Sequence, residues 1–181
     1  MLERLSLRLA ERIVANENGT QDDVEILNYE IGIRLANYSI IVLTIIAACV
    51  FGVLLESIVC LIALSMLRKF SGGAHFKSLT LCVLVSVLLF ILVPLILVTF
   101  VELNIASTMT ITTIAFIIMM FYAPNIFIER NTSSIDPYNK LISLAVVTCN
   151  YFIQSEVIAV AFLIQAITIL PWRGKHEKHI V

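Results

Sequence analysis

Charged side chains are scarce in this chain. Lys, Arg, Asp and Glu make up 14% of its 181 residues, whereas a soluble globular domain carries about a quarter. Hydrophobic residues make up 60% of the chain and gather into long runs. The composition therefore excludes a soluble globular domain and predicts an all-α, polytopic membrane protein.

Motifs for metal, cofactor and nucleic-acid chemistry are also missing. The four cysteines form no CxxC pair, which argues against dithiol redox chemistry and against a structural zinc site. The sequence contains no Gly-rich phosphate loop, no zincin motif and no basic surface interleaved with aromatic residues. We therefore expect no metal, no cofactor and no nucleic-acid partner.

Residues 1–36 are predicted to form an amphipathic helical hairpin. Residues 2–15 lack the continuous apolar core of a signal peptide and carry two stripes at helical spacing instead. The stripes are Arg4, Arg8 and Arg12 on one side and Leu2, Leu5, Leu9 and Ile13 on the other. This pattern suits a helix lying in the membrane interface against anionic lipids. The alternative is an amphipathic helix packed on its own protein.

A second helix is expected after the break at residues 16–19. Thr20 and Asp23 have the spacing of a capping box. Apolar residues then recur at helical spacing from Val24 to Tyr38. We expect this helix to lead directly into the membrane.

Apolar regions follow at residues 37–55, 57–67, 80–101, 105–122, 141–153 and 157–170. A transmembrane helix needs about 20 residues, with about 17 as a practical minimum, so the second and fifth regions are short. Fusing the first two and the last two regions gives an alternative with four spans. With a cytoplasmic N-terminus, six spans place every Lys and Arg inside, whereas four spans place Arg68, Lys69 and Lys77 outside. The positive-inside tendency favours six transmembrane helices.

Three segments follow from this topology: a cytoplasmic or interfacial part at 1–36, a membrane domain at 37–170, and a basic cytoplasmic tail at 171–181. The outer turns would carry acidic residues and no basic ones. These residues are Glu56, Glu102 and Glu156. For Glu56 and Glu156 the alternative is an acid inside the membrane, which normally marks a functional site. A turn explains both more simply.

The loop at residues 68–82 carries the candidate chemistry. Cys82 follows His75 by seven residues, at the point where a basic segment leads into a membrane helix. Nearby cations, an imidazole partner and the positive end of a helix beginning near Ser78 would all stabilise a thiolate. Cys49, Cys60 and Cys149 lie inside apolar runs, where cysteine behaves as a small hydrophobic residue. We predict that Cys82 is a nucleophile and His75 its base.

This pairing needs a turn in the chain. Residues seven apart in one helix are separated by about 10 Å along its axis, too far for a hydrogen bond. Gly72 and Gly73 favour a turn that folds the loop back toward the thiol. Glycines also let backbone N–H groups approach a substrate, as an oxyanion site requires.

Supporting residues are less well defined. Arg68, Lys69 and Lys77 would add positive charge near the thiol. The cytoplasmic candidates for a third catalytic residue that orients His75 are Asn125, Glu129 and Asp136. The alternative is a basic inner loop with a glycine turn, a chance histidine and a buried thiol.

The same loop resembles the accessory gene regulator B (AgrB) family of bacterial quorum sensing. Residues 68–75 read RKFSGGAH, and with Cys82 they are similar to the core signature of that family. The chain length, apolar composition, cytoplasmic N-terminus and basic tail also fit. The resemblance covers essentially the whole chain.

The resemblance implies a multi-pass cysteine endopeptidase in the bacterial cell membrane, working as a homodimer. Its substrate would be a small precursor peptide with an amphipathic leader and an acidic C-terminal tail. Members of the family cut before the tail, hold the remaining peptide as a thioester and release it as a thiolactone or lactone. Carried over, Cys82 would be the nucleophile and His75 the general base, and Arg68 and Gly73 match further motif positions.

A different function is suggested by the small all-helical bundle itself. The chain would then be a non-catalytic membrane peptide exporter or scaffold, which binds or moves a peptide without changing it covalently. The two functions differ in whether they need the Cys82 thiol.

Overall fold

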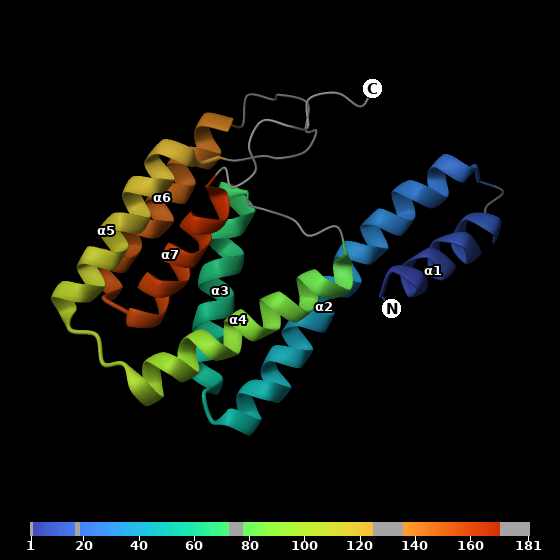
Figure 1. The fold of residues 1–181 in the computed structure, drawn as a ribbon. Helices are drawn as coiled ribbons and strands as arrows, with labels where there is room; N and C mark the ends of the chain where they lie inside the picture. Colours follow the sequence, from blue (N-terminus) through green and yellow to red (C-terminus); the bar gives the residue numbers. More distant parts are fainter. Residues whose placement is uncertain (1, 17–18, 73–77, 125–135, 171–181) are drawn as a thin grey trace. The chain divides into compact units, whose positions relative to one another are not determined.

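The computed structural model describes residues 2–16, 19–72, 78–124 and 136–170, and within them the chain forms α-helices and no strand (Figure 1). The helices are α1 (Leu2–Asn16), α2 (Gln21–Phe51), α3 (Leu54–Ser71), α4 (Leu79–Phe100), α5 (Ile105–Tyr122), α6 (Asp136–Ile153) and α7 (Glu156–Ile169). The all-α prediction is confirmed. The chain divides into two compact units: Met1–Ile58 with His75–Phe100, and Val59–Ala74 with Val101–Val181.

In the first unit, α1 and the beginning of α2 form the predicted amphipathic hairpin. Thr20 and Asp23 make the predicted capping box, because Thr20 Oγ1 accepts from the Asp23 backbone N–H and the Asp23 carboxylate accepts from the Thr20 N–H. Ala10, Val14 and Val24 form the small core between the two helices. Helix α2 then continues without a break to Phe51, as expected for a helix that leads into the membrane.

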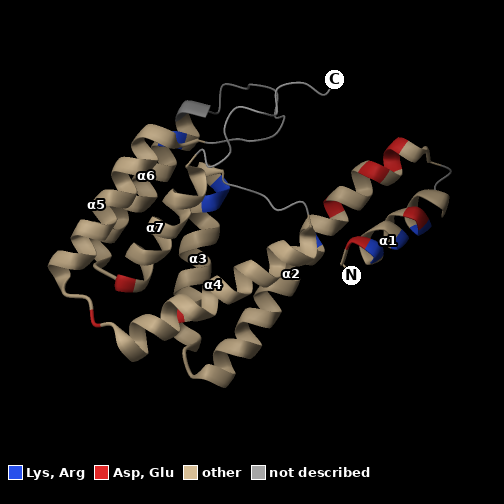
Figure 2. Ribbon diagram, in the orientation of Figure 1, with Lys and Arg blue, Asp and Glu red and all other residues tan. Residues whose placement is uncertain are grey.

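Helix α1 packs on its own protein through a face of small residues. Its buried residues are Ser6, Ala10 and Val14. The predicted aliphatic stripe stays open, since Leu5, Leu9 and Ile13 are 39–47% exposed. The three arginines of α1 are exposed as well, and its charged residues are visible in Figure 2. One face of α1 therefore packs on its own protein and the aliphatic stripe stays exposed, while contact of that stripe with a membrane remains a prediction.

Gly32 lies where α1, α2 and α4 converge. A Cβ atom at this position would approach the Leu79 side chain to 2.8 Å and the Ser6 hydroxyl to 3.6 Å. The missing side chain therefore lets the beginning of α4 lie close against α2. Ser6 reinforces this point of contact by donating a 2.7 Å hydrogen bond to Asn28 Oδ1 of α2.

The break between α2 and α3 differs from the prediction. The sequence places an outer turn at Glu56, but α2 ends at Phe51 and Glu56 lies in the first turn of α3. Gly52 explains the earlier break because it adopts the left-handed conformation (φ 72°) that commonly ends a helix, and its N–H donates to Ala48 O. The predicted break before Glu156 is confirmed: Gln154 has φ 57° and Ser155 caps α7.

In the second unit, α5 packs against α6 and α7. Asn150, which is fully buried, ties these helices together. Its side-chain amide donates to Thr112 Oγ1 of α5 at 2.9 Å, and its carbonyl oxygen accepts from the Ser155 N–H at 3.2 Å. The tight turn between α6 and α7 is thus closed by a side chain that also bonds to α5.

Charges separate along the helices of the second unit (Figure 2). Arg68 and Lys69 occupy the last turn of α3, next to the end of α7. Glu156 begins α7 at the opposite end, where its carboxylate accepts a 3.2 Å hydrogen bond from the Leu103 N–H. This is the segregation on which the predicted orientation depends.

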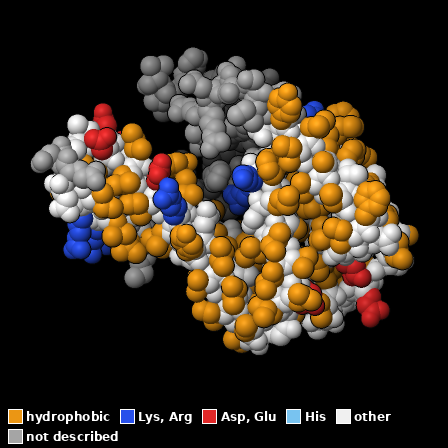
Figure 3. All heavy atoms as spheres, turned by 180° about the vertical axis from the view of Figure 1, so that it is seen from behind, with side chains coloured by type: hydrophobic (Ala, Val, Ile, Leu, Met, Phe, Trp, Pro, Cys, Tyr) orange, Lys and Arg blue, Asp and Glu red, His pale blue; other side chains and the backbone are white. Residues whose placement is uncertain are grey.

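The chain is a helical membrane protein. Among the described helices, α2, α4 and α5 are long and apolar enough to cross a membrane, and α7 is a shorter apolar helix. Hydrophobic side chains cover much of the visible surface (Figure 3), and Val50 and Phe152 are 78% and 85% exposed. Helices α3 and α6 have 18 residues each, which is longer than their apolar regions alone. Six spans remain a prediction.

Candidate functional site

Cys82 lies at the beginning of α4 and is partly buried. Ser78 immediately precedes this helix. Its hydroxyl oxygen accepts from the Leu81 N–H at 3.4 Å, and its carbonyl oxygen accepts from the Cys82 N–H at 3.1 Å. Ser78 is therefore the N-cap of the helix that the sequence predicts to begin near it, and its carbonyl oxygen is bonded directly to the backbone of the candidate nucleophile.

A carboxylate from α1 occupies the same helix start. Glu3 Oε1 accepts from the Ser78 hydroxyl at 2.8 Å and from the Thr80 N–H at 3.1 Å, and Oε2 accepts from the Thr80 hydroxyl at 2.9 Å. Hydrogen bonds from its own backbone N–H, from Ser78 and from the Thr80 N–H hold the pKa of Glu3 well below its usual range. Glu3 is thus ionised at neutral pH.

This contact changes the electrostatics expected around Cys82. The sequence alone predicts that the positive end of the helix favours a thiolate there. The Glu3 carboxylate satisfies donors at that end and brings a negative charge to it, which opposes this contribution. The predicted activation of Cys82 would then rest more on His75 and on the cations of the loop.

The first part of the motif forms the end of α3. The Gly72 N–H donates to Arg68 O at 3.1 Å, and Gly72 has φ 73°, a conformation that glycine adopts without strain. The Lys69 ammonium lies 5.6 Å from the centre of the Phe70 ring. The predicted glycine turn therefore begins at Gly72.

Gln165 of α7 holds this turn in place. Its side-chain amide donates to Ser71 Oγ at 3.0 Å and to Gly72 O at 2.7 Å. Ser71 is fully buried and Gln165 is 3% exposed. A buried polar contact thus fixes the last residues of α3 against α7.

Several predicted site residues lie outside the described part of the chain. These are Gly73, His75 and Lys77 of the loop, together with Asn125 and Glu129, and the side chain of Asp136 is likewise not described. The pairing of His75 with Cys82 therefore stays a prediction.

The other cysteines lie in different surroundings. Cys60 is buried, whereas Cys49 and Cys149 are exposed on the apolar helices α2 and α6. Within residues 2–16, 19–72, 78–124 and 136–170, no three His, Cys, Asp or Glu side chains are grouped so as to hold a metal ion.

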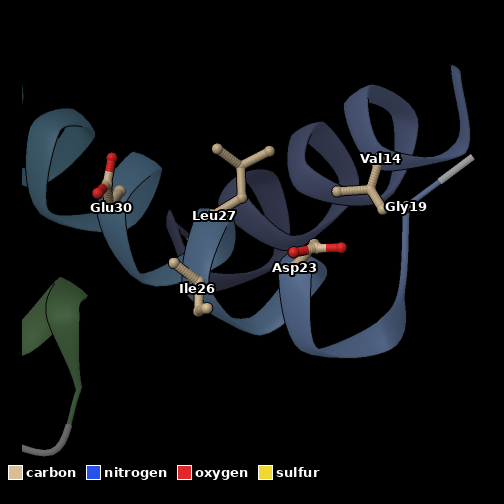
Figure 4. Close-up of a pocket in the computed structure, with 6 residues that line it drawn as sticks. All are labelled: Val14, Gly19, Asp23, Ile26, Leu27 and Glu30. Carbon is tan, nitrogen blue, oxygen red and sulfur yellow. The ribbon is translucent and has the colours of Figure 1, made fainter. Parts of the chain in front are cut away.

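A hollow lies between the arms of the hairpin (Figure 4). It is lined by Val14, Gly19, Asp23, Ile26, Leu27 and Glu30. The Asp23 carboxylate is already engaged with Thr20. None of the lining residues belongs to the predicted site, so the hollow adds nothing to the chemistry of Cys82.

Sequence reasoning did not identify Glu3 or Gln165. For Gln165 a signal was available, because it is an amide inside the apolar region 157–170. Glu3 gives no comparable signal, since it contacts residues 75 to 77 positions further along the chain.

Comparison with known proteins adds a family relationship. The sequence model of the family described as Accessory gene regulator B matches residues 6–169. This range includes the RKFSGGAH segment and Cys82. No solved structure matches the chain.

Relatives of this chain include proteins of Clostridium and Staphylococcus. AgrB-like protein 2 of Clostridium perfringens strain 13 is 26% identical over 140 residues, which cover 77% of this chain and 64% of that protein. Accessory gene regulator protein B of Staphylococcus lugdunensis is 27% identical over 163 residues, covering 83% of this chain and 85% of its own length. The corresponding Staphylococcus aureus protein (strain bovine RF122) is 24% identical over 162 residues, with the same coverage. The chain thus spans just under two thirds of the length of the Clostridium relative.

Proposed function

The chain belongs to the accessory gene regulator B family, and from that premise we propose that it is a membrane cysteine endopeptidase that processes a quorum-sensing precursor peptide. Cys82 is the nucleophile and His75 is its general base. The substrate is a small peptide with an amphipathic leader and an acidic C-terminal tail. The enzyme works as a homodimer in the bacterial cell membrane, with both termini in the cytoplasm.

The position of Cys82 carries this proposal. It is partly buried in the first turns of a helix that directly follows the RKFSGGAH segment. Cys60, by contrast, is fully buried, and the other two cysteines lie in apolar helices away from this motif in the sequence. Of the four thiols, Cys82 alone combines a helix start, a basic flanking loop and a histidine nearby in the sequence.

The reaction begins when the Cys82 thiolate attacks the carbonyl carbon of the peptide bond that precedes the acidic tail. His75 takes the thiol proton and delivers it to the departing amine, so that the tail leaves with a free N-terminus. The remaining peptide is held as a thioester on Cys82. A cysteine or serine of the peptide then attacks this thioester, which closes the ring and returns the thiol.

The proposed reaction has one energetic requirement, and two physical features support it. Replacing an amide by a thioester is uphill, so exclusion of water and departure of the tail must favour ring closure over hydrolysis and reversal. Basic residues such as Arg68 and Lys69 at the end of α3 attract an acidic tail. The membrane concentrates an amphipathic leader on the same surface.

Cys82→Ala tests the proposal directly when it is compared with Cys60→Ala. In liposomes that contain the purified protein and the precursor, we expect Cys82→Ala to lower the cleavage rate by at least about 10³-fold, because it removes the nucleophile. Cys60→Ala alters a thiol that the reaction does not use and is expected to retain most of the activity. Products are measured by mass spectrometry.

Equal loss of cleavage in both variants, at normal membrane levels, would argue against a special role for Cys82. A precursor that binds to wild type and to Cys82→Ala but stays intact in both would favour the exporter or scaffold function.

A further inference from the structure

We propose that Glu3 is a positioning residue for Cys82: through its carboxylate, α1 fixes the first turn of α4 and thereby sets the direction of the thiol. This inference rests on the proposed function, in which Cys82 attacks the precursor. It assigns to the N-terminal helix a part in the reaction beyond contact with the membrane.

The contact is specific and has several bonds. Both carboxylate oxygens of Glu3 are used, and they reach the cap residue Ser78 as well as the backbone and hydroxyl of Thr80. Ser78 in turn accepts from the Cys82 N–H through its carbonyl oxygen. One residue therefore separates the Glu3 carboxylate from the backbone of the candidate nucleophile.

Helix α1 is itself held firmly enough to act as a support. Glu3, Ser6, Ala10 and Val14 recur at intervals of three and four residues and share one face of α1. The last three of these residues are buried. Glu3 thus extends the packed face of α1 onto the start of α4.

Helix α2 packs against both partners of this contact. Ser6 bonds to Asn28, and Gly32 leaves room for Leu79, the first residue of α4. The beginning of α4 is therefore contacted by two other helices of the same unit. Loss of Glu3 removes one of these two supports and leaves the first turn free to fray.

Attack on a carbonyl requires the nucleophile to be held close to one geometry, and a displacement of about 1 Å can cost on the order of 100-fold in rate. The first turn of a helix is its least stable part, because its N–H groups lack partners within the helix. The Glu3 carboxylate is such a partner, and Glu3 does not touch the reacting atoms. Its role is therefore to position Cys82.

The test compares Glu3→Ala, Glu3→Gln and Glu11→Ala in the full-length protein in liposomes. Gln has the same shape as Glu. Its carbonyl oxygen can accept from the Ser78 hydroxyl and the Thr80 N–H, and its amide can donate to the Thr80 hydroxyl. Glu11 is an exposed carboxylate on the same helix and gives the matched control. We expect Glu3→Ala to lower kcat about tenfold with KM changed less than about twofold, since binding of the precursor is unaffected.

Glu3→Gln is expected to stay within about threefold of the wild-type kcat, and Glu11→Ala to match the wild type. This rescue by the isosteric amide would assign the effect to geometry. The positioning role would be overturned if kcat fell as much in Glu3→Gln as in Glu3→Ala. An increased kcat in either variant, or a change confined to KM, would overturn it as well.

Alkylation of the cysteines by iodoacetamide, read by peptide mass spectrometry, needs no precursor. A freed first turn exposes Cys82, so its alkylation in Glu3→Ala should rise at least about threefold while that of the buried Cys60 stays unchanged. Unchanged Cys82 alkylation, or an equal rise at Cys60 through general unfolding, would overturn the inference. A wild type that cleaves no precursor but shows this alkylation pattern would refute the proposed function and leave the link between Glu3 and Cys82 standing.

Discussion

Gln165 is a polar side chain inside an apolar helix, and it stabilises the packing of that helix against the end of α3. Its amide reaches from α7 to Ser71, the last residue of α3, and to Gly72 directly after it, and bonds to both. The Gly72 carbonyl that it satisfies belongs to the residue at which the glycine turn begins. Gln165 therefore stabilises the point from which the loop of the RKFSGGAH segment departs.

We predict that Gln165→Ala lowers the free energy of unfolding by about 1–2 kcal/mol, because it leaves buried polar groups at the end of α3 without this donor. Gln21→Ala, at an exposed amide in the first turn of α2, is the matched control and should change stability little. Unfolding of both variants in detergent micelles provides the measurement. A loss of the same size in both would show that the Gln165 contacts add no stability of their own.

At the scale of single residues, the sequence predicted groups whose partners are near in the chain. The start of a helix near Ser78 and the Thr20 capping box follow from the local sequence, and both are confirmed. The contacts of Glu3 and Gln165 join residues from 75 to 94 positions apart. Spacing rules act within one helix, so contacts of this kind depend on packing that the sequence does not display.

At the scale of elements, α1 presents two different faces to two different surroundings. Ser6, Ala10 and Val14 pack on the protein, whereas Leu5, Leu9 and Ile13 remain exposed. Aliphatic side chains in such a stripe gain free energy when they enter the interface of a bilayer. The sequence identified the amphipathic stripe, but it gave no sign that small residues would form the packed face.

Single tryptophans can show which face of α1 meets lipid. In a background with the one native tryptophan, Trp172, replaced by Phe, we predict that brominated phospholipids quench Leu9→Trp at least about twice as strongly as Glu11→Trp, which points to the opposite side of the helix. Equal quenching at the two positions would contradict an interfacial orientation of α1.

The breaks between helices show which residues end a helix in this chain. The break before Glu156 was predicted correctly because several turn-forming residues coincide there, whereas the break expected at Glu56 occurs at Gly52. A glycine in the left-handed conformation ends a helix more effectively than an acidic residue does. The glycine is therefore the better signal for this helix end than the position of the acidic residue.

At the scale of the whole molecule, charge placement is the main evidence for orientation. In the second unit, basic residues end α3 while Glu156 begins α7 at the other end. Composition and hydrophobic runs were sufficient to predict an all-helical membrane protein, because a bilayer leaves few other ways to satisfy the backbone. Neither property determines how many of the helices cross the membrane.

Cysteine labelling in intact cells tests the six-span topology. Gln154 lies in the turn before α7, and Tyr138, which is 68% exposed, lies near the start of α6. In a background with all four native cysteines replaced by Ala, we predict that a membrane-impermeant maleimide labels Gln154→Cys in intact cells and Tyr138→Cys only in permeabilised cells. The opposite pattern would reverse the orientation. Absence of labelling at position 154 from either side would contradict an outer turn there.

The central claim is that Cys82 forms a covalent bond to the precursor. The most direct measurement is mass spectrometry of the protein after rapid acid quenching of a reaction with the precursor in liposomes, followed by mapping of the modified residue. We predict an adduct on Cys82 with the mass of the precursor without its C-terminal tail, because an acyl-enzyme thioester retains that part. Release of the tail with no adduct on Cys82, or with the adduct on another cysteine, would contradict the account.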